Sequence, residues 1–290
     1  MRAVAHRIDA NGLRHFIRDS GDEDAPAAIL LHGFPDSSAV WNDVTPLLVA
    51  SGFRVIAPDM RGFGETDIPE TLADYDIRSG AGADVIAILD HLKIDRAHLV
   101  GHDFGAAVAW ALAAERPDRF LSLAALSVGH PRAFLAAGAE QKRKSFYIVV
   151  HQLRGVCEWL YRRNDWALFR TRWNGVRGFD EMLALISRPG RLTAGLNWYR
   201  ANISLKRMLV PPAEGEFGEE TVRIPTLGIW PEGDAFLGEE QMAGSRNYVE
   251  APWTYEPVAG AGHWVQVDAP DRVAALLERH WRRAPPAPNR

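Results

Sequence analysis

The sequence is poor in cysteine and has no long apolar run. Its 290 residues contain one cysteine, Cys157, which excludes an internal disulfide and leaves no cysteine cluster with metal-ligand spacing. We therefore expect no metal, no cofactor and no redox chemistry. No apolar stretch is long enough to cross a membrane, and residues 1–12 lack the apolar core of a signal peptide. These absences predict a cytoplasmic protein without a membrane partner.

An excess of charge of one sign is missing as well. The 33 Lys and Arg residues are mixed with 37 Asp and Glu residues, for a formal net charge of -4. Without a basic stripe to neutralise phosphates, we expect no nucleic-acid partner. The hydrophobic fraction of 47% is enough for a large core, and the length alone allows one domain or two. A homodimer is possible, and the sequence does not determine the oligomeric state.

Short strand-like runs alternate with helical patterns in much of the chain. Asn11-Gly12 separates two of these runs, which predicts an edge hairpin closed by a two-residue turn. Alternation of buried strands and helices implies a mostly parallel sheet covered by helices on both faces. The expected strands cover residues 4–8, 13–17, 27–31, 54–58, 97–101, 121–127, 225–230 and 254–258; the clearest expected helices cover 77–92, 104–115 and 270–281.

The pattern changes in the middle of the chain. From His130 to about Pro212, aromatic residues, arginines and helical periodicity dominate, and no strand is evident. We expect a helical cap inserted at residues 130–212 between two parts of an α/β core, 1–129 and 213–290. The proline-rich end from Ala284 predicts an irregular tail.

An aspartate occupies a sharp turn between a predicted strand and a predicted helix. The segment Gly101-His102-Asp103-Phe104-Gly105 is similar to the G-x-S-x-G nucleophile elbow of α/β-hydrolases, with Asp103 in the place of the serine. The simpler interpretation is that Asp103 only caps the following helix.

A second turn carries the same resemblance. His32-Gly33-Phe34-Pro35 follows the strand at 27–31, where an α/β-hydrolase has its oxyanion-hole loop. The resemblance implies that the backbone N–H groups of Phe34 and Phe104 form the oxyanion hole, although Gly and Pro also suit an ordinary turn. The segment from Asp59 to Thr66 resembles a further loop of the family, and we expect it to be structural.

The resemblance also implies an acid and a base, in the chain order nucleophile, acid, histidine. His263 lies in a glycine-rich turn after the last expected strand, and Asp234 follows the strand at 225–230. Glu232 competes with Asp234, but its offset from the strand fits the family less well. No carboxylate occurs at 127–129, where some relatives carry the acid, which favours Asp234.

An aspartate nucleophile restricts the chemistry. A carboxylate is anionic near neutral pH and can attack an sp3 carbon, which leaves an alkyl ester on Asp103. Hydrolysis of this ester needs water activated by His263, with Asp234 holding its tautomer. Aspartate elbows of this superfamily occur chiefly in epoxide hydrolases, haloalkane dehalogenases and fluoroacetate dehalogenases, and the leaving group separates these enzymes.

Two tyrosines favour an epoxide. An epoxide oxygen needs a proton donor, and the segments around Tyr147 and Tyr199 resemble those that place two cap tyrosines over the nucleophile of epoxide hydrolases. The alternative is that both rings only pack the cap. The sequence does not decide whether five other aromatic residues line an apolar pocket or only pack the cap. These are Trp159, Tyr161, Trp166, Trp173 and Trp198.

The donors that a halide needs are missing. Haloalkane dehalogenases typically have Asn and Trp where this chain has Phe34 and Phe104, and a phenyl ring donates no hydrogen bond. The arginines that follow the nucleophile of fluoroacetate dehalogenases are absent too. Epoxide hydrolases often have Trp at position 104, so the shape of the pocket is in doubt, and Trp264 is expected to pack beneath His263.

We therefore predict an epoxide hydrolase acting on an apolar small-molecule epoxide, whose identity the sequence does not specify. A dehalogenase with the same covalent mechanism is the alternative. A binding protein that retains the fold without turnover is a lesser one.

Overall fold

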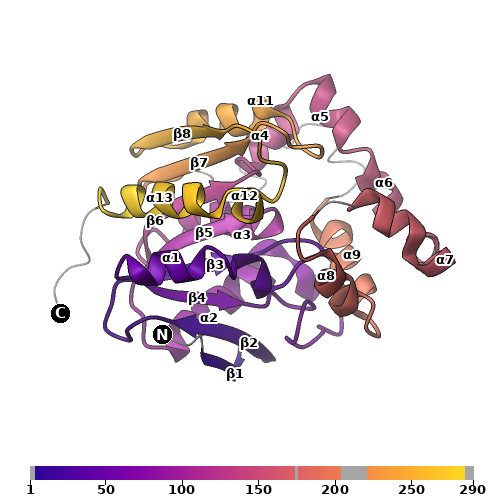
Figure 1. Ribbon diagram of the computed structural model, residues 1–290, viewed down its shortest axis with the longest axis horizontal. Coiled ribbons are helices and arrows are strands. Elements are labelled where there is room, and N and C mark those ends of the chain that lie inside the picture. Colours follow the sequence, from indigo (N-terminus) through magenta and orange to yellow (C-terminus); the bar gives the residue numbers. More distant parts are fainter. Residues whose placement is uncertain (1–3, 174–175, 204–220, 285–290) are drawn as a thin grey trace.

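The computed structural model describes residues 4–173, 176–203 and 221–284. Its centre is an eight-stranded sheet with the order β1-β2-β4-β3-β5-β6-β7-β8 (Figure 1). Strands β3 to β8 pair in parallel, and β2 pairs antiparallel with β1 and β4. The strands are β1 (Val4–Ala10), β2 (Leu13–Ser20), β3 (Ala27–Leu31), β4 (Arg54–Pro58), β5 (Ala97–His102), β6 (Phe120–Leu126), β7 (Thr226–Pro231) and β8 (Trp253–Val258).

Two apolar layers cover the sheet, one on each face. Strands β3 to β7 are buried at every residue, as expected of strands in a sheet that helices cover on both sides. One core cluster includes residues of α2 (Ala83–His91) and α3 (Phe104–Glu115), and the other includes residues of α1 (Thr45–Ala50) and α13 (Pro270–Trp281). The expected α/β fold with a mostly parallel sheet is confirmed.

The edge hairpin forms as the sequence predicts. Asn11 and Gly12 have φ angles of 47° and 76°, which a two-residue turn between twisted strands requires. Strand β1 is an outer strand of the sheet.

Among the described residues, six helices lie between β6 and β7, and we call the segment of residues 131–202 the helical insertion. It projects to one side of the sheet in Figure 1. Its helices are α4 (Pro131–Ala136), α5 (Ala139–Lys144), α6 (Tyr147–His151), α7 (Val156–Arg172), α8 (Phe179–Ile186) and α9 (Arg191–Asn202). The predicted end of the cap near residue 212 and the tail at 285–290 lie outside the described residues.

The helix expected over 77–92 differs at its start. Residues Ile77–Gly82 form a π-helical turn, and α2 begins only at Ala83. The carboxylate of Asp76 accepts hydrogen bonds from the N–H groups of Arg78 and Ser79, while the carbonyl of Gly80 accepts one from the Arg61 guanidinium. The Asp76 carboxylate thus satisfies two N–H groups of the first turn, which have no partner within a helix, and Arg61 pairs the Gly80 carbonyl.

In the described residues between β7 and α13, three short helical segments accompany β8: α11 (Glu239–Ala243) and a 3-10 helix (Gly244–Tyr248) precede it, and α12 (Val265–Asp268) follows it. Among the described residues, no helix is long and apolar enough to span a bilayer.

Candidate active site

Asp103 stands in a strained turn between β5 and α3. Its backbone has φ 54° and ψ -123°, a conformation that costs a non-glycine residue about 1–3 kcal/mol. Gly33 allows the neighbouring loop to approach, because a Cβ there would overlap the Asp103 carboxylate. Gly101 and Gly105 likewise leave no room for a side chain, since a Cβ on either would meet backbone atoms. The glycines that suggested an elbow are therefore required by its geometry.

The loop after β3 contacts the carboxylate of Asp103 directly. The backbone N–H of Phe34 donates a hydrogen bond of 2.9 Å to Asp103 Oδ1. The imidazole of His32 holds this loop to the next one, because its Nε2 accepts a hydrogen bond of 2.9 Å from the Met60 N–H. Phe104 begins α3, so its N–H belongs to the free N-terminal turn of the helix. A donor pair at this position is what an oxyanion on Asp103 needs.

His263 lies between two carboxylates. Its Nδ1 donates a hydrogen bond of 2.7 Å to Asp234 Oδ2, and its Nε2 is 3.6 Å from Asp103 Oδ2. The imidazole is buried, and so is Asp234. Glu232, the competing acid, is exposed on the same loop. The structure thus brings together the three residues that the sequence singled out.

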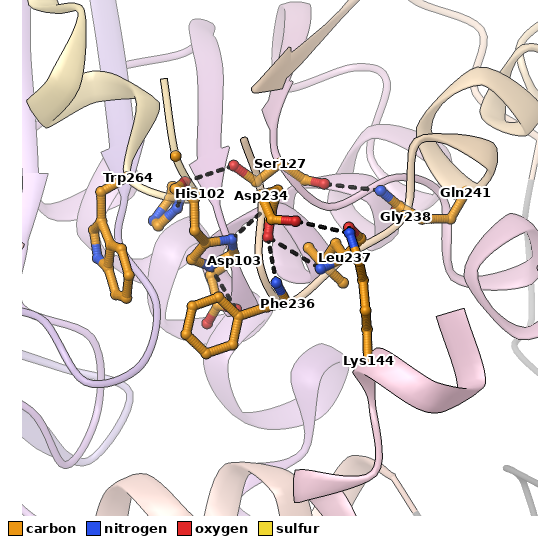
Figure 2. Close-up of polar contacts among 12 residues, drawn as sticks. His102, Asp103, Ser127, Lys144, Asp234, Phe236, Leu237, Gly238, Gln241 and Trp264 are labelled. Atoms are coloured by element: carbon orange, nitrogen blue, oxygen red, sulfur yellow. Dashed lines mark hydrogen bonds and ion pairs between the residues drawn. The ribbon is translucent and has the colours of Figure 1, made fainter. Parts of the chain in front are cut away.

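The backbone of His263 is fixed by two residues that sequence reasoning missed. Its carbonyl accepts hydrogen bonds from His102 Nε2 at 2.9 Å and from Ser127 Oγ at 2.8 Å (Figure 2). Burial lowers the pKa of His102 to about 3, so this imidazole is neutral at physiological pH. His102 is the last residue of β5 and Ser127 directly follows β6, but neither motif spacing nor residue type indicated these contacts.

The charges within the triad reinforce one another. Burial alone would lower the pKa of His263, but Asp234 and Asp103 outweigh it and raise this pKa to about 10. Burial alone would raise the pKa of Asp103, but His263, His102 and the Phe34 N–H outweigh it and lower this pKa. Asp103 is therefore an anion at neutral pH, as a nucleophile must be.

A lysine of the helical insertion holds the loop that carries the acid. Asp234 Oδ1 accepts hydrogen bonds from the N–H groups of Phe236 and Leu237, at 2.7 and 3.0 Å. Lys144 Nζ, at the end of α5, donates to the carbonyls of Asp234 and Leu237 at 2.8 and 2.6 Å (Figure 2). The lysine belongs to a sequence run of mixed polarity, in which nothing predicted this contact.

Trp264 is bound to a further buried acid, Asp36. Its indole Nε1 donates a hydrogen bond of 2.7 Å to Asp36 Oδ2, and its ring is perpendicular to that of His263 at a centroid distance of 5.0 Å. Burial raises the pKa of Asp36 to about 7. The sequence signal for Asp36 was its place directly after the His32–Pro35 turn, where it was overlooked.

Tyr147 in helix α6 and Tyr199 in helix α9 lie together at the cavity that Asp103 also lines. Their ring centroids are 6.0 Å apart, and both residues line one cavity with Asp103. Burial raises the pKa of each phenol above its ordinary value, so both stay protonated. Tyr199 also packs edge-on against the rings of Phe34 and Phe104.

The cavity at Asp103 has a volume of about 340 Å³ and is mainly apolar. None of the five aromatic residues in question is among the described residues that line it. Tyr161, Trp173 and Trp198 are buried in the core, and Trp159 is exposed. The buried rings therefore contribute to packing, with Trp198 also donating a hydrogen bond to the Arg61 carbonyl, and none of the five lines the cavity at Asp103. In the described part of the chain, no three His, Cys, Asp or Glu side chains are grouped to hold a metal.

Several known proteins are similar to this chain in sequence and in fold. Residues 26–270 match the α/β-hydrolase fold family. Epoxide hydrolase A of Mycobacterium tuberculosis is 30% identical over 93% of this chain and 95% of its own length, and the AB hydrolase superfamily protein YfhM of Bacillus subtilis is 31% identical with the same coverage. The crystal structure of epoxide hydrolase A from Mycobacterium thermoresistibile superposes with a TM-score of 0.82 at 28% identity, covering 99% of this chain and 100% of the other. The chain belongs to the α/β-hydrolase family.

Proposed function

We propose that this protein is an epoxide hydrolase that converts an apolar epoxide and water to a vicinal diol through an ester on Asp103. The observation that carries the proposal is the shared cavity of Asp103, Tyr147 and Tyr199, with protonated phenols facing an ionised carboxylate. The names of the relatives agree with this chemistry.

In the first step the carboxylate of Asp103 attacks a carbon of the epoxide ring. The C–O bond breaks, and the oxygen takes a proton or a hydrogen bond from Tyr147 and Tyr199. Burial keeps both phenols protonated and therefore able to donate. Phenylalanine at 34 and 104 gives no side-chain donor for a halide, which makes an epoxide the better substrate.

In the second step water attacks the carbonyl carbon of the Asp103 ester. His263 removes a proton from this water, and Asp234 fixes the imidazole tautomer through the bond to Nδ1. The N–H groups of Phe34 and Phe104 stabilise the oxyanion. Collapse of the tetrahedral intermediate breaks the ester C–O bond, and the departing oxygen takes the remaining proton of the attacking water, which releases the diol and restores the Asp103 carboxylate. The proton that His263 carries in the free protein replaces the one that the epoxide oxygen took from a phenol in the first step.

The helical insertion supports the same assignment as a cap. It supplies both tyrosines, and it covers the nucleophile with apolar side chains that limit access of bulk water. We retain residues 130–212 as the proposed extent of this cap between core segments 1–129 and 213–290, although its last residues lie outside the described part of the chain.

One turnover in water labelled with heavy oxygen tests the covalent route. With enzyme in excess, the first diol should carry unlabelled oxygen from Asp103, because solvent oxygen enters the carboxylate and not the product. Diol that is fully labelled in the first turnover would contradict an ester intermediate.

Trapping of the ester tests the role of His263. We expect His263→Gln to accumulate protein whose mass exceeds that of the free chain by the mass of the epoxide. Glu232→Gln, which changes an exposed group on the acid loop, is the control and should accumulate none. If haloalkanes release halide and epoxides form no adduct, the dehalogenase alternative replaces the proposal.

A further inference from the structure

The cavity at Asp103 extends along one face of α3. Phe104, Ala107, Ala111 and Glu115 all line it. Their spacing of three or four residues places them on one stripe of the helix, and the stripe from 104 to 115 is about 16 Å long at 1.5 Å per residue. The cavity therefore continues well beyond the reacting carbon.

Small residues leave room for the part of the cavity that runs along α3, from Ala107 to Glu115, which we call the arm. Ala107 is half-buried and Ala111 is nearly buried, and neither has atoms beyond Cβ to fill the space. The opposite wall is apolar, with Phe134 and Leu135 of α4 and Ile148 of α6. An apolar chain from the epoxide can be buried here without leaving a polar group unpaired.

Charged residues stand at the other end of the arm. Arg78 and Glu115 form an ion pair whose side chains keep 27% and 32% of their exposure, so the cavity reaches solvent at this point. Asp76 lies beside them and caps the π-helical turn with its carboxylate, which accepts hydrogen bonds from Arg78 and Ser79. The formal charge of Asp76, Arg78 and Glu115 together is -1, the sum of two carboxylates and one guanidinium.

We propose that the substrates are epoxides with an extended, uncharged apolar chain, and that Ala107, Ala111 and Glu115 determine this specificity. The chain lies along α3 between Ala111 and Phe134. Glu115 neutralises Arg78 and, with Asp76, disfavours a chain that ends in a carboxylate. This inference rests on the proposed epoxide hydrolase function.

Two pairs of substrates separate the effects of length and charge. Among terminal epoxides, kcat/KM should rise from epoxybutane to epoxydecane, by up to about fourfold for each buried methylene. Among chains of equal length, kcat/KM should be about tenfold higher for epoxyundecanol than for epoxyundecanoate, because the carboxylate would lie near the net negative charge of Asp76, Arg78 and Glu115. A flat dependence on length, or a preference for the carboxylate, overturns the inference.

Two variants fill the arm. Ala111→Phe should lower kcat/KM for epoxydecane far more than for epoxybutane, since only the long substrate reaches this position. Ala107→Leu, at a half-buried position one turn nearer Asp103, should likewise lower kcat/KM more for epoxydecane than for epoxybutane. Equal losses for both substrates in both variants contradict a specificity role.

The charge is tested by Glu115→Gln. This change removes the Glu115 charge from the ion pair with Arg78 and should narrow the preference for epoxyundecanol by about fivefold. The matched control is Asp118→Asn, which removes the same charge at a position three residues after Glu115. The Asp118 side chain pairs with Arg116 and does not line the cavity. Equal effects of the two variants refute the role of Glu115. Failure of every epoxide, epoxybutane included, overturns the proposed function itself.

Discussion

His263 has a charge that depends on the state of Asp103. In the free protein both carboxylates raise its pKa to about 10, so the imidazole is protonated at neutral pH. An ester on Asp103 has no charge, and the ion pair across 3.6 Å then disappears. The pKa of His263 must fall, and the imidazole becomes a base when the second step needs one.

The two steps should therefore respond differently to pH. We expect ester hydrolysis to accelerate as pH rises and to level off below pH 10, once His263 in the ester is neutral. Ester formation should stay constant over this range, because Asp103 is ionised and both phenols are protonated. Rapid quenching followed by intact-mass measurement gives both rates. Hydrolysis that does not change with pH would contradict His263 as the base.

The phenols of Tyr147 and Tyr199 should share the work of stabilising the epoxide oxygen. We expect either substitution by Phe to lower the rate of ester formation by about tenfold to a hundredfold, and the double substitution to lower it further. Tyr248→Phe is the control, because this ring stacks on His130 away from the nucleophile. Single-turnover rates with an epoxide measure the effect. Two active single variants with an inactive double variant would agree with overlapping roles, whereas an active double variant would exclude both.

At the scale of elements, local sequence decided which predictions succeeded. Strands β3 and β4 and helices α3 and α13 have the predicted bounds, since each is a continuous apolar or amphipathic run between turn residues. The π-helical turn at Ile77–Gly82 was not predicted, and its Gly80 carbonyl accepts a hydrogen bond from Arg61, a residue outside the local sequence pattern. Pattern reasoning cannot see such contacts.

The candidate site divides in the same way. Asp103 and His263 were found because each lies in a glycine-containing turn at a strand end, and the structure puts their side chains within 3.6 Å. Lys144 was missed because its partners are backbone carbonyls ninety residues away along the chain, and a carbonyl has no sequence signature. The arm of the cavity along α3 was not predicted for a similar reason, because alanines in a helix usually indicate packing in the core.

Helix α5 connects the helical insertion to the acid loop, and its contribution can be measured. Lys144→Met removes two hydrogen bonds to that loop, so we expect ester hydrolysis to slow by about tenfold through misorientation of Asp234. Ester formation should change little. Lys144→Arg retains a cationic donor and should recover part of the rate. The control is Lys142→Met, at an exposed position on the same helix.

Comparison of the two rates in each variant decides between positioning and general damage. A Lys144→Met protein that loses both rates equally, or that unfolds at a much lower temperature, would indicate a structural role for the lysine. Selective loss of ester hydrolysis with normal thermal unfolding would indicate that the loop positions the acid.

For the molecule as a whole, buried neutral histidines oppose the effect of His263 on stability. Burial lowers the pKa of His98 and His151 to about 3, and that of His280 to about 4. The ordinary value is 6.5, so the unfolded chain binds these protons first as the pH falls. Their contribution to folding is present above pH 6.5 and is lost below it. His263 has a raised pKa, and its contribution is instead present below pH 6.5 and lost as pH rises toward 10.

Acid should therefore destabilise the protein through groups far from the nucleophile. His98 stacks on Trp281 at 5.0 Å, and His280 bonds the carbonyl of Leu123, both on the sheet face covered by α13. The double variant with His98→Gln and His280→Gln should be less stable than the parent at pH 6.5. When the pH falls from 6.5 to 5.5, however, its free energy of unfolding should decrease by about 2 kcal/mol less than that of the parent, which is about 1 kcal/mol for each histidine replaced. Urea unfolding at the two pH values measures this difference. His91→Gln, at an exposed position, should follow the parent. A double variant that loses as much as the parent would show that carboxylates, not buried imidazoles, govern the acid sensitivity of this fold.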